Sequence, residues 1–200
     1  MEPVNTITGT MVPLMRPNVD TDQIVAKQSL KRVDRTGFGP YLFYDWAHDS
    51  EGEPRTDFVL NDPAYRAARV LVTGRNFGSG SSREHAPWGL MDWGFRAIVA
   101  TSFADIFRRN CYKNGLLPVV LDESAVKHLA DLAQEDPTAE VVVDLEAQKV
   151  TAAKLESTFE IDPFVKECLL KGLDEIDLTL TAEAEIARFE DSRPRYKPSV

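Results

Sequence analysis

The residues best suited to chemistry in this sequence lie in one ten-residue string, GRNFGSGSSR, at positions 74–83. Its glycines, Gly74, Gly78 and Gly80, permit positive φ angles and a close approach of the backbone to a ligand. A helix is expected to follow, and its first N–H groups would face the string. Arg83 adds a planar set of donors that matches a carboxylate at two points. Together these features predict an anion site, for a carboxylate or a phosphate.

A purely structural role is the alternative for this glycine loop (residues 74–83). Ser81 to Glu84 fit the capping-box pattern S-x-x-E, in which a serine caps a helix and the glutamate reaches back to it. The string lacks the lysine of a phosphate-binding P-loop and the G-x-G-x-x-G spacing of a dinucleotide site. Ser81 is therefore expected to belong to an anion site, to a helix cap, or to both at once.

The segments around the glycine loop predict alternating strands and helices. Apolar, β-branched runs at 69–73, 96–100 and 116–121 are typical of buried strands. Helices are expected between them, at 84–93 and 103–112. Alternation at this spacing is typical of βαβ units with a parallel sheet. The predicted fold class is α/β, with a mostly parallel βαβ core, additional β elements and a helical C-terminal part.

The first third of the chain predicts short strands and long loops, because it is rich in turn-forming residues such as Pro13. Residues 27–39 form the longest expected loop, and a long irregular connection in a compact domain is usually functional or mobile. The last third predicts a helix at 123–134 and a hairpin of two strands at 140–144 and 149–152. Two further helices are predicted at 163–171 and 181–190. We expect a single domain over residues 1–190 and a disordered tail at 191–200.

Charge and composition narrow the classes of partner. The formal net charge of −9 argues against nucleic acid, because binding to phosphates requires a basic face. No apolar run approaches the length of a membrane span, and the first residues lack the features of a signal peptide. The expectation is a cytoplasmic protein that contacts neither membrane nor nucleic acid.

The cysteines and histidines predict no metal centre made by this chain alone. Cys111 and Cys168 are far apart in sequence, and the three histidines, His48, His85 and His128, lie at no ligand-like spacing. Zinc and iron–sulfur sites draw on three or four such ligands at short spacings. We expect both cysteines to be ordinary half-buried thiols, with no disulfide.

Four strings carry a resemblance to a known family. They are GRNFGSGSSREHAPWGL at 74–90, RAIVATSFADIFRRNCYKNGLLPV at 96–119, VDTDQI at 19–24 and KQSLKRVDRTGFGPYLFYDW at 27–46. Together they resemble the swivelling domain of the aconitase superfamily and, more closely, the small subunits of bacterial 3-isopropylmalate dehydratases. The resemblance covers roughly residues 5–190.

The resemblance implies a role for each matching residue. Ser81 would be the general base toward the substrate carbon acid, and Ser82 and Arg83 would bind a substrate carboxylate. Asp22, in the VDTDQI string, would lie at the same site, and Gly78 and Gly80 would shape the loop backbone. A serine is a poor base at its ordinary pKa, so nearby N–H groups and an arginine would have to stabilise its alkoxide.

The reaction implied is the isomerisation of 2-isopropylmalate to 3-isopropylmalate through isopropylmaleate, a step of leucine biosynthesis. Removal of hydroxide needs a Lewis acid, which in this family is an iron of a [4Fe–4S] cluster. The cysteine pattern places no such cluster on this chain. The family carries it on a separate large subunit, so the resemblance implies a heterodimer that is active only when both subunits are present.

Substrate choice is expected to depend on the loop at 27–39. Leu30 is a candidate to face an isopropyl group, since matching one small apolar group contributes about 1–3 kcal/mol. Arg32 and Arg35 lie near the position where relatives that act on citrate bind a third carboxylate, although the same basic residues suit a solvated surface or a subunit contact. The alternatives are a small subunit for homoaconitate or 2-methylmalate, and a stand-alone module that binds a phosphorylated metabolite.

Several neighbouring residues have a structural interpretation that is at least as good as a functional one. His85 is expected to pack locally, and Trp88 and Trp93 to belong to the core. Asp105 and Asn110 either line the site or make structural bonds. The basic residues of the segment at 108–113 are expected to form a surface or partner-facing patch.

Overall fold

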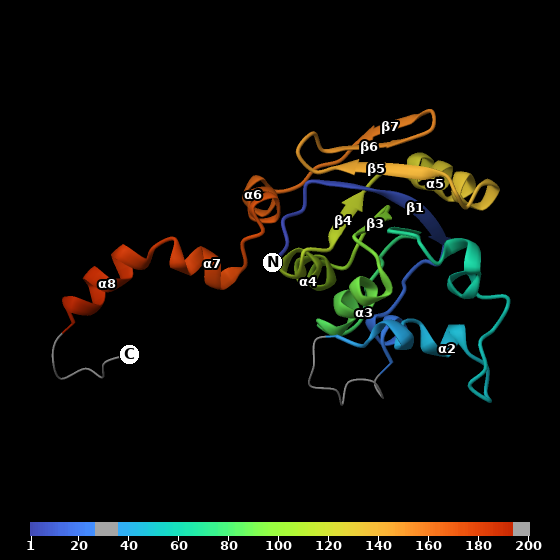
Figure 1. Cartoon of the computed structure of the whole chain (residues 1–200), viewed down its shortest axis with the longest axis horizontal. Coiled ribbons are helices and arrows are strands. Elements are labelled where there is room, and N and C mark those ends of the chain that lie inside the picture. The colour runs from blue at the N-terminus through green and yellow to red at the C-terminus, as the bar shows by residue number, and fades with distance from the viewer. Residues whose placement is uncertain (27–35, 194–200) are drawn as a thin grey trace.

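The structure, a computed structural model, describes residues 1–26 and 36–193. Within these residues seven strands form one sheet in the order β4-β3-β2-β1-β5-β6-β7 (Figure 1). In chain order the strands are β1 Thr6–Leu14, β2 Val70–Thr73, β3 Ala97–Ala100, β4 Leu117–Val120, β5 Glu140–Asp144, β6 Lys149–Ala152 and β7 Leu155–Thr158.

Strand β1 joins a parallel half of the sheet to an antiparallel half. Its second half, from Met11, pairs in parallel with β2, and β2, β3 and β4 continue in parallel. Its first half, Thr6 to Thr10, pairs antiparallel with β5, and β6 and β7 continue in that sense. Pro13, which suggested a turn, lies inside β1. Pairing with β5 stops before this residue, so its missing N–H disrupts no ladder there.

The described helices differ widely in length. They are α1 Thr21–Ile24, α2 Tyr44–Ala47, α3 His85–Trp93, α4 Asp105–Asn114, α5 Glu123–Glu135, α6 Pro163–Lys171, α7 Glu175–Leu180 and α8 Glu183–Asp191. In the described part of the chain, 3-10 turns lie at Gly39–Tyr41, Val59–Asn61 and Pro63–Tyr65. None of the described helices is long and apolar enough to cross a membrane.

Each face of the sheet carries its own apolar core, because successive strand residues point to opposite faces. In β2, Val70 and Val72 pack into the core beneath α5, while Leu71 packs into the core on the side of α3 and α4. Helix α5 lies along one face, and α3 and α4 cover the other (Figure 1). Helix α4 buries Phe107 and Cys111 in the second core. That packing places α4 directly behind the glycine loop.

The predicted α/β class is confirmed, as are the strands and helices predicted between residues 69 and 171. The structure adds β7, α7 and the two short helices α1 and α2. In the first third, where only short strands were expected, β1 has nine residues and is the longest described strand. Helices α1 and α2 have four residues each, too short for a helical period to show in the sequence. A capping box between Asp20 and Gln23 stabilises the start of α1.

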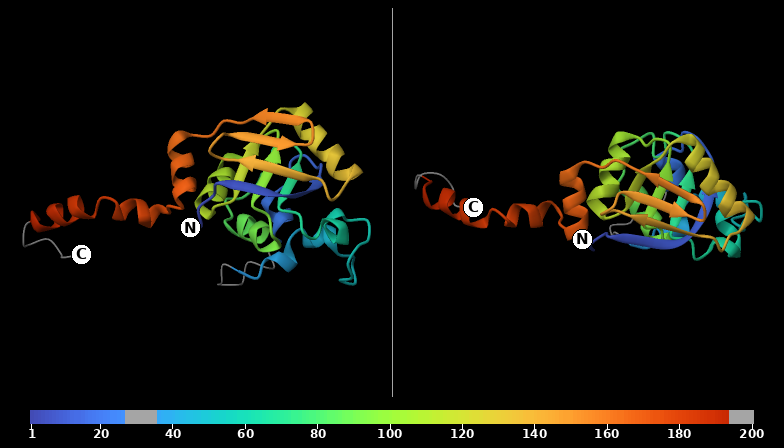
Figure 2. Two further views of the ribbon diagram at one scale, coloured as in Figure 1. Left: turned by 45° about the horizontal axis from the view of Figure 1, so that its top comes forward. Right: turned by 90° about the horizontal axis from the view of Figure 1, so that it is seen from above.

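Helices α7 and α8 project from the rest of the molecule as an extended arm (Figure 2). Helix α8 ends at Asp191, and residues 194–200 lie outside the described part of the chain. One domain over residues 1–190 with a tail at 191–200 therefore stays a prediction.

Candidate functional site

The glycine loop connects β2 to α3 and is held by backbone contacts on both sides. A Cβ at Gly74 would lie 2.7 Å from the carbonyl oxygen of Arg16, so only glycine fits there without a shift. Asn76 has a φ of 55°, and its N–H donates to Ser102 Oγ over 2.9 Å. Its Nδ2 donates to Asn18 Oδ1 over 3.0 Å. The first half of the loop is thereby fixed to two neighbouring turns.

Gly78 and Gly80 are required both for their conformation and for space. Their φ angles are 77° and 94°, in the left-handed region that favours glycine. A Cβ at Gly78 would lie 2.1 Å from the Phe107 ring, and one at Gly80 would lie 2.2 Å from the Asp20 carboxylate. The two glycines let the loop lie directly against α4 on one side and against the Asp20 turn on the other.

The turn at Asp20–Ile24 lies beside the glycine loop, although some sixty residues separate the two in sequence. Asp20 and Ser79 form a parallel β-bridge, and the Thr21 N–H donates to the Ser79 carbonyl over 2.8 Å. The buried Thr21 hydroxyl donates to the carbonyl of Ser81 over 3.0 Å. The sequence pointed to Asp22 in this turn but missed Asp20 and Thr21. The capping-box spacing of Asp20 and Gln23 was the available signal.

Asp22 and Arg83 form an ion pair between the turn and the loop. The pair is made through Arg83 Nη1, and the side chains of Arg83 and Asp22 are 16% and 35% exposed. Ser81 and Ser82, just before the arginine, are exposed. The structure therefore gathers Asp22, Ser81, Ser82 and Arg83, which were predicted as site residues, into one place.

The capping-box interpretation of Ser81 is wrong. Helix α3 begins at His85, its N-cap residue is Glu84, and no side chain makes a cap hydrogen bond. The reason is a tight turn ahead of the helix, in which the Arg83 N–H donates to the Ser81 carbonyl over 2.9 Å. The serine hydroxyls are thus not committed to capping, and the first turn of the helix is left without a side-chain acceptor.

His85 packs locally, as expected, between two aromatic rings. It makes edge contacts with Phe38, at 5.3 Å between centroids, and with Trp88, at 4.9 Å. Burial lowers the pKa of His85 below 6.5, the nearby charge of Arg83 lowers it further, and Glu84 partly offsets them. Burial and the arginine therefore both favour the neutral imidazole.

The loop predicted at 27–39 is anchored at its described ends. Val25 forms an antiparallel bridge with Leu42, and the Phe43 N–H donates to the Ile24 carbonyl over 2.8 Å. The buried Phe38 donates its N–H to Asp92 Oδ2 on α3 over 2.7 Å. The two predicted specificity residues, Leu30 and Arg32, lie outside the described residues, as does Arg35.

The other polar neighbours make structural bonds. The Trp88 indole donates to Asn114 Oδ1 over 2.8 Å, and Asn114 donates in turn to the Asn110 carbonyl. Asp105 is exposed and pairs with Arg108 at 3.6 Å. Trp88 and Trp93 both pack against the core on the α3 side, which fits their expected role.

Both cysteines are free thiols; Cys168 is half-buried, as expected, whereas Cys111 is fully buried. Complete burial raises the pKa of Cys111 well above its ordinary value, and partial burial raises that of Cys168. Among residues 1–26 and 36–193, no three histidine, cysteine or acidic side chains gather in a way that could hold a metal ion.

The exposed serines and the fixed arginine present hydrogen-bond donors and a positive charge that suit a small carboxylate. A guanidinium has five N–H donors, so the pair through Nη1 leaves donors for a second carboxylate. The uncapped first turn of α3 adds partial positive charge close by. These positive groups would stabilise the negative charge that develops on a serine oxygen acting as a base.

Substituting Gly78 tests how tightly the glycine loop lies against α4. Gly78→Ala should lower the free energy of unfolding about 1–3 kcal/mol more than Gly52→Ala, because overpacking adds to conformational strain. Gly52 is the matched control, since its φ is 85° but a Cβ there would meet only the Tyr44 hydroxyl, at 3.7 Å. Urea unfolding of both variants measures the difference. Equal losses would contradict the close packing on Phe107.

The Arg83→Gln variant should raise the pKa of His85, because the substitution removes a neighbouring positive charge. NMR titration of the His85 imidazole in both proteins measures the change. A lowered folded-state pKa means that neutral His85 stabilises the fold at pH above 6.5 and that this contribution declines as the pH falls. An unchanged or lower midpoint in the variant would contradict the contact.

Comparison with known proteins places this geometry in a family. A model of the aconitase C-terminal domain matches residues 1–124, and a LeuD_N model matches residues 127–163. A 3-isopropylmalate dehydratase small subunit from Rubrobacter xylanophilus is 53% identical over 200 residues, all of both chains. One from Halalkalibacterium halodurans is 54% identical over 194 residues, 96% of this chain and 100% of that protein.

The fold agrees with a solved structure. The 3-isopropylmalate dehydratase LeuD of Methanocaldococcus jannaschii superposes with a TM-score of 0.63 at 23% identity, over 92% of this chain and 98% of that one. At that identity the likeness concerns the fold. The full-length identities and the two matching models agree with the residues gathered at the glycine loop, and the chain belongs to the 3-isopropylmalate dehydratase small-subunit family, with the fold of the aconitase C-terminal domain.

Proposed function

We propose that this chain supplies half of the active site of a 3-isopropylmalate dehydratase and completes that site with a large subunit. The observation that carries the proposal is the cluster of Ser81, Ser82 and Arg83, with Arg83 held by Asp22. The relatives at about 50% identity or more are named for isopropylmalate. These names do not favour homoaconitate or 2-methylmalate as the substrate. They also do not favour a stand-alone binding module.

Arg83 and Ser82 bind a carboxylate of the substrate in this proposal. Asp22 holds the guanidinium in one orientation before the substrate arrives, which reduces the entropy lost on binding. Asp22 itself carries negative charge, so it is suited to orienting the arginine rather than to contacting a dicarboxylate directly. Its role is therefore refined from substrate binding to positioning.

Ser81 is the proposed general base that accepts the proton from the substrate carbon. The proton moves to Ser81 Oγ, and the charge of Arg83 and the first N–H groups of α3 make the required alkoxide less costly. Thr21 fixes the position of Ser81 through its hydrogen bond to the serine carbonyl. This bond orients the residue while the hydroxyl stays exposed to the substrate.

The large subunit has two tasks in this scheme. Its [4Fe–4S] cluster supplies the Lewis acid that assists departure of the substrate hydroxide. The large subunit also covers the exposed serines, which keeps bulk water away from a reactive alkoxide. Residues 1–26 and 36–193 gather no set of side chains that could hold a metal ion, which fits a division of labour in which the cluster belongs to the partner. Leucine biosynthesis in the cytoplasm is the proposed setting.

Leu30 and Arg32 are the proposed specificity residues of this half-site. Both lie outside the described residues, in the segment that follows Ala26, and Ala26 is four residues after Asp22. In this proposal Leu30 contacts the isopropyl group and Arg32 lies near a carboxylate.

The direct test is reconstitution. The purified chain is mixed with a cluster-loaded large subunit of a 3-isopropylmalate dehydratase, and isopropylmaleate formation is followed by absorbance. We expect turnover from the mixture and none from either chain alone. Turnover by this chain alone, or none with a large subunit that is active with its own small subunit, would overturn the proposal.

Replacing Ser81 tests the general base. Ser81→Ala should reduce kcat of the reconstituted enzyme about 100- to 10 000-fold, because a positioned base contributes that much. Its unfolding should be unchanged, since the side chain is exposed and caps no helix. Ser79→Ala is the matched control, because the Ser79 hydroxyl makes only long bonds, of 3.3 Å, to backbone carbonyls. An unfolded Ser81→Ala protein, or one with normal kcat, would contradict the assignment.

The Asp22→Asn variant tests the positioning role. An asparagine keeps the size but weakens the contact to Arg83, so KM for isopropylmalate should rise about 10- to 100-fold, the value of a charged hydrogen bond. The kcat value should fall much less, because Asp22 contacts the arginine and not the reacting atoms. Steady-state kinetics separate the two parameters. A fall in kcat with constant KM would instead place Asp22 at the reacting atoms.

A further inference from the structure

The arm formed by α7 and α8 exposes apolar side chains along its length. It comprises residues 174–191 and projects from the body (Figure 2). Its most exposed apolar residues are Ile176 at 70%, Phe189 at 67% and Leu180 at 57%. Helices of six and nine residues are shorter than the length of about 12–15 residues at which isolated helices become even marginally stable in water. The arm therefore requires a surface to pack against.

The charge of the arm indicates the kind of surface that it fits. Residues 174–191 carry seven acidic side chains and one basic side chain, Arg188, so most of the net charge of −9 resides there. A complementary partner has an apolar groove with a basic rim. A second copy of this chain has the same acidic arm and the same net charge, which disfavours self-association.

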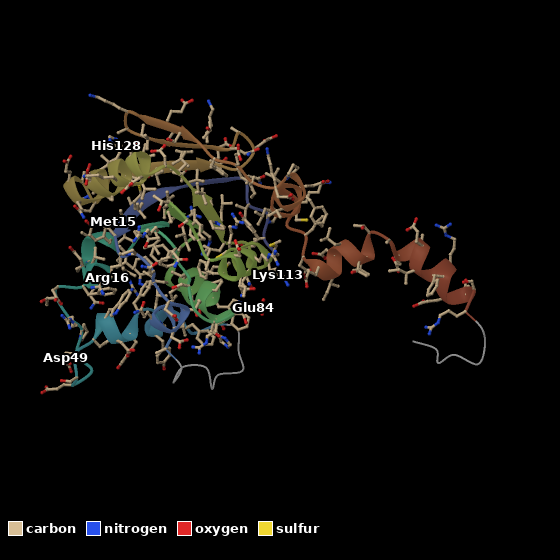
Figure 3. The ribbon with its side chains drawn as sticks, turned by 180° about the vertical axis from the view of Figure 1, so that it is seen from behind. Met15, Arg16, Asp49, Glu84, Lys113 and His128 are labelled. Atoms are coloured by element: carbon tan, nitrogen blue, oxygen red, sulfur yellow. The ribbon has the colours of Figure 1, made fainter. Side chains whose placement is uncertain are left out.

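A groove connects the arm to the active-site loop. It has a volume of about 580 Å³ and lies between α4, α6 and the start of the arm. Its lining includes the exposed Phe164 at the α6 side and Leu178 at the arm. Glu84, the residue directly after Arg83, also lines the groove. Figure 3 shows Glu84 and Lys113 at the end of the body from which the arm leaves.

An ion pair sets the direction of the arm at its base. Lys113 on α4 contacts Glu175 in the first turn of α7 at 2.8 Å. The N-terminal amine of Met1 also donates to the Gly172 carbonyl over 2.8 Å, just before the arm begins. The arm therefore leaves the body from a fixed point beside the groove.

We propose that the arm and this groove form the docking surface for the large subunit, an inference that rests on the proposed function. A partner that covers Ser81 to Arg83 must also cover Glu84, and from there the surface continues through the groove onto the arm. A second copy seated in the groove would obstruct the same edge of the site. In this arrangement Leu180 and Phe189 insert into an apolar groove of the large subunit whose rim is basic.

The test measures the affinity of the reconstituted pair. Leu180→Asp and Phe189→Asp should each raise the Kd for the large subunit about 10- to 100-fold, as expected for buried apolar anchors. Turnover at saturating large subunit should be retained, because the arm contacts no reacting group. Met15→Asp is the matched control, since Met15 is 43% exposed and lies at the opposite end of the body (Figure 3). The association rate of the wild-type pair should fall as salt is raised.

The outcomes separate this inference from the proposed function. A wild-type pair that turns over isopropylmalate while both arm variants bind like wild type would overturn the docking surface alone. Equal weakening by Met15→Asp would also overturn it. If sedimentation shows wild-type dimers of this chain that Phe189→Asp dissociates, with large-subunit affinity unchanged, the arm pairs with a second copy instead. A wild-type pair without turnover would count against the proposed function.

Discussion

The ion pair between Asp22 and Arg83 connects two segments that do not neighbour each other in sequence. It forms only because the Asp20 turn lies directly against the glycine loop, and that contact needs a residue without a side chain at Gly80. The Thr21 hydroxyl ties the same turn to the Ser81 carbonyl. The positions of the serines and the arginine thus depend on one another, and the site is a unit of two crossing segments.

This dependence explains how an exposed site can be well ordered. The serine hydroxyls face solvent, but the backbone beneath them is fixed by β-bridges, by Phe107 and by the start of α3. Rigid support under an open surface is suited to a site that another protein completes. The partner can add groups and exclude water without first ordering this half.

The sequence predicted the middle of the fold well, because strands such as 70–73 and helices such as α5 carry clear periodicities. It also pointed to Asp22, Ser81, Ser82 and Arg83, which the structure places together. Single-turn elements such as α1 left no periodic signal, and Asp20 and Thr21 act through tertiary contacts. The capping error at Ser81 arose because S-x-x-E is a local pattern, whereas the turn before α3 depends on the packing of the whole loop.

The anchored ends of the loop at 27–39 have a consequence for how substrate range can diverge. The β-bridge between Val25 and Leu42 joins the two ends of this loop, and the Phe38 N–H is hydrogen-bonded to Asp92 on α3. These contacts are made by residues of the scaffold and not by residues 27–35. If Leu30 and Arg32 select the substrate as proposed, loops of different length and composition can be exchanged at this base. Substrate preference can then evolve, or be engineered, separately from the proposed base Ser81.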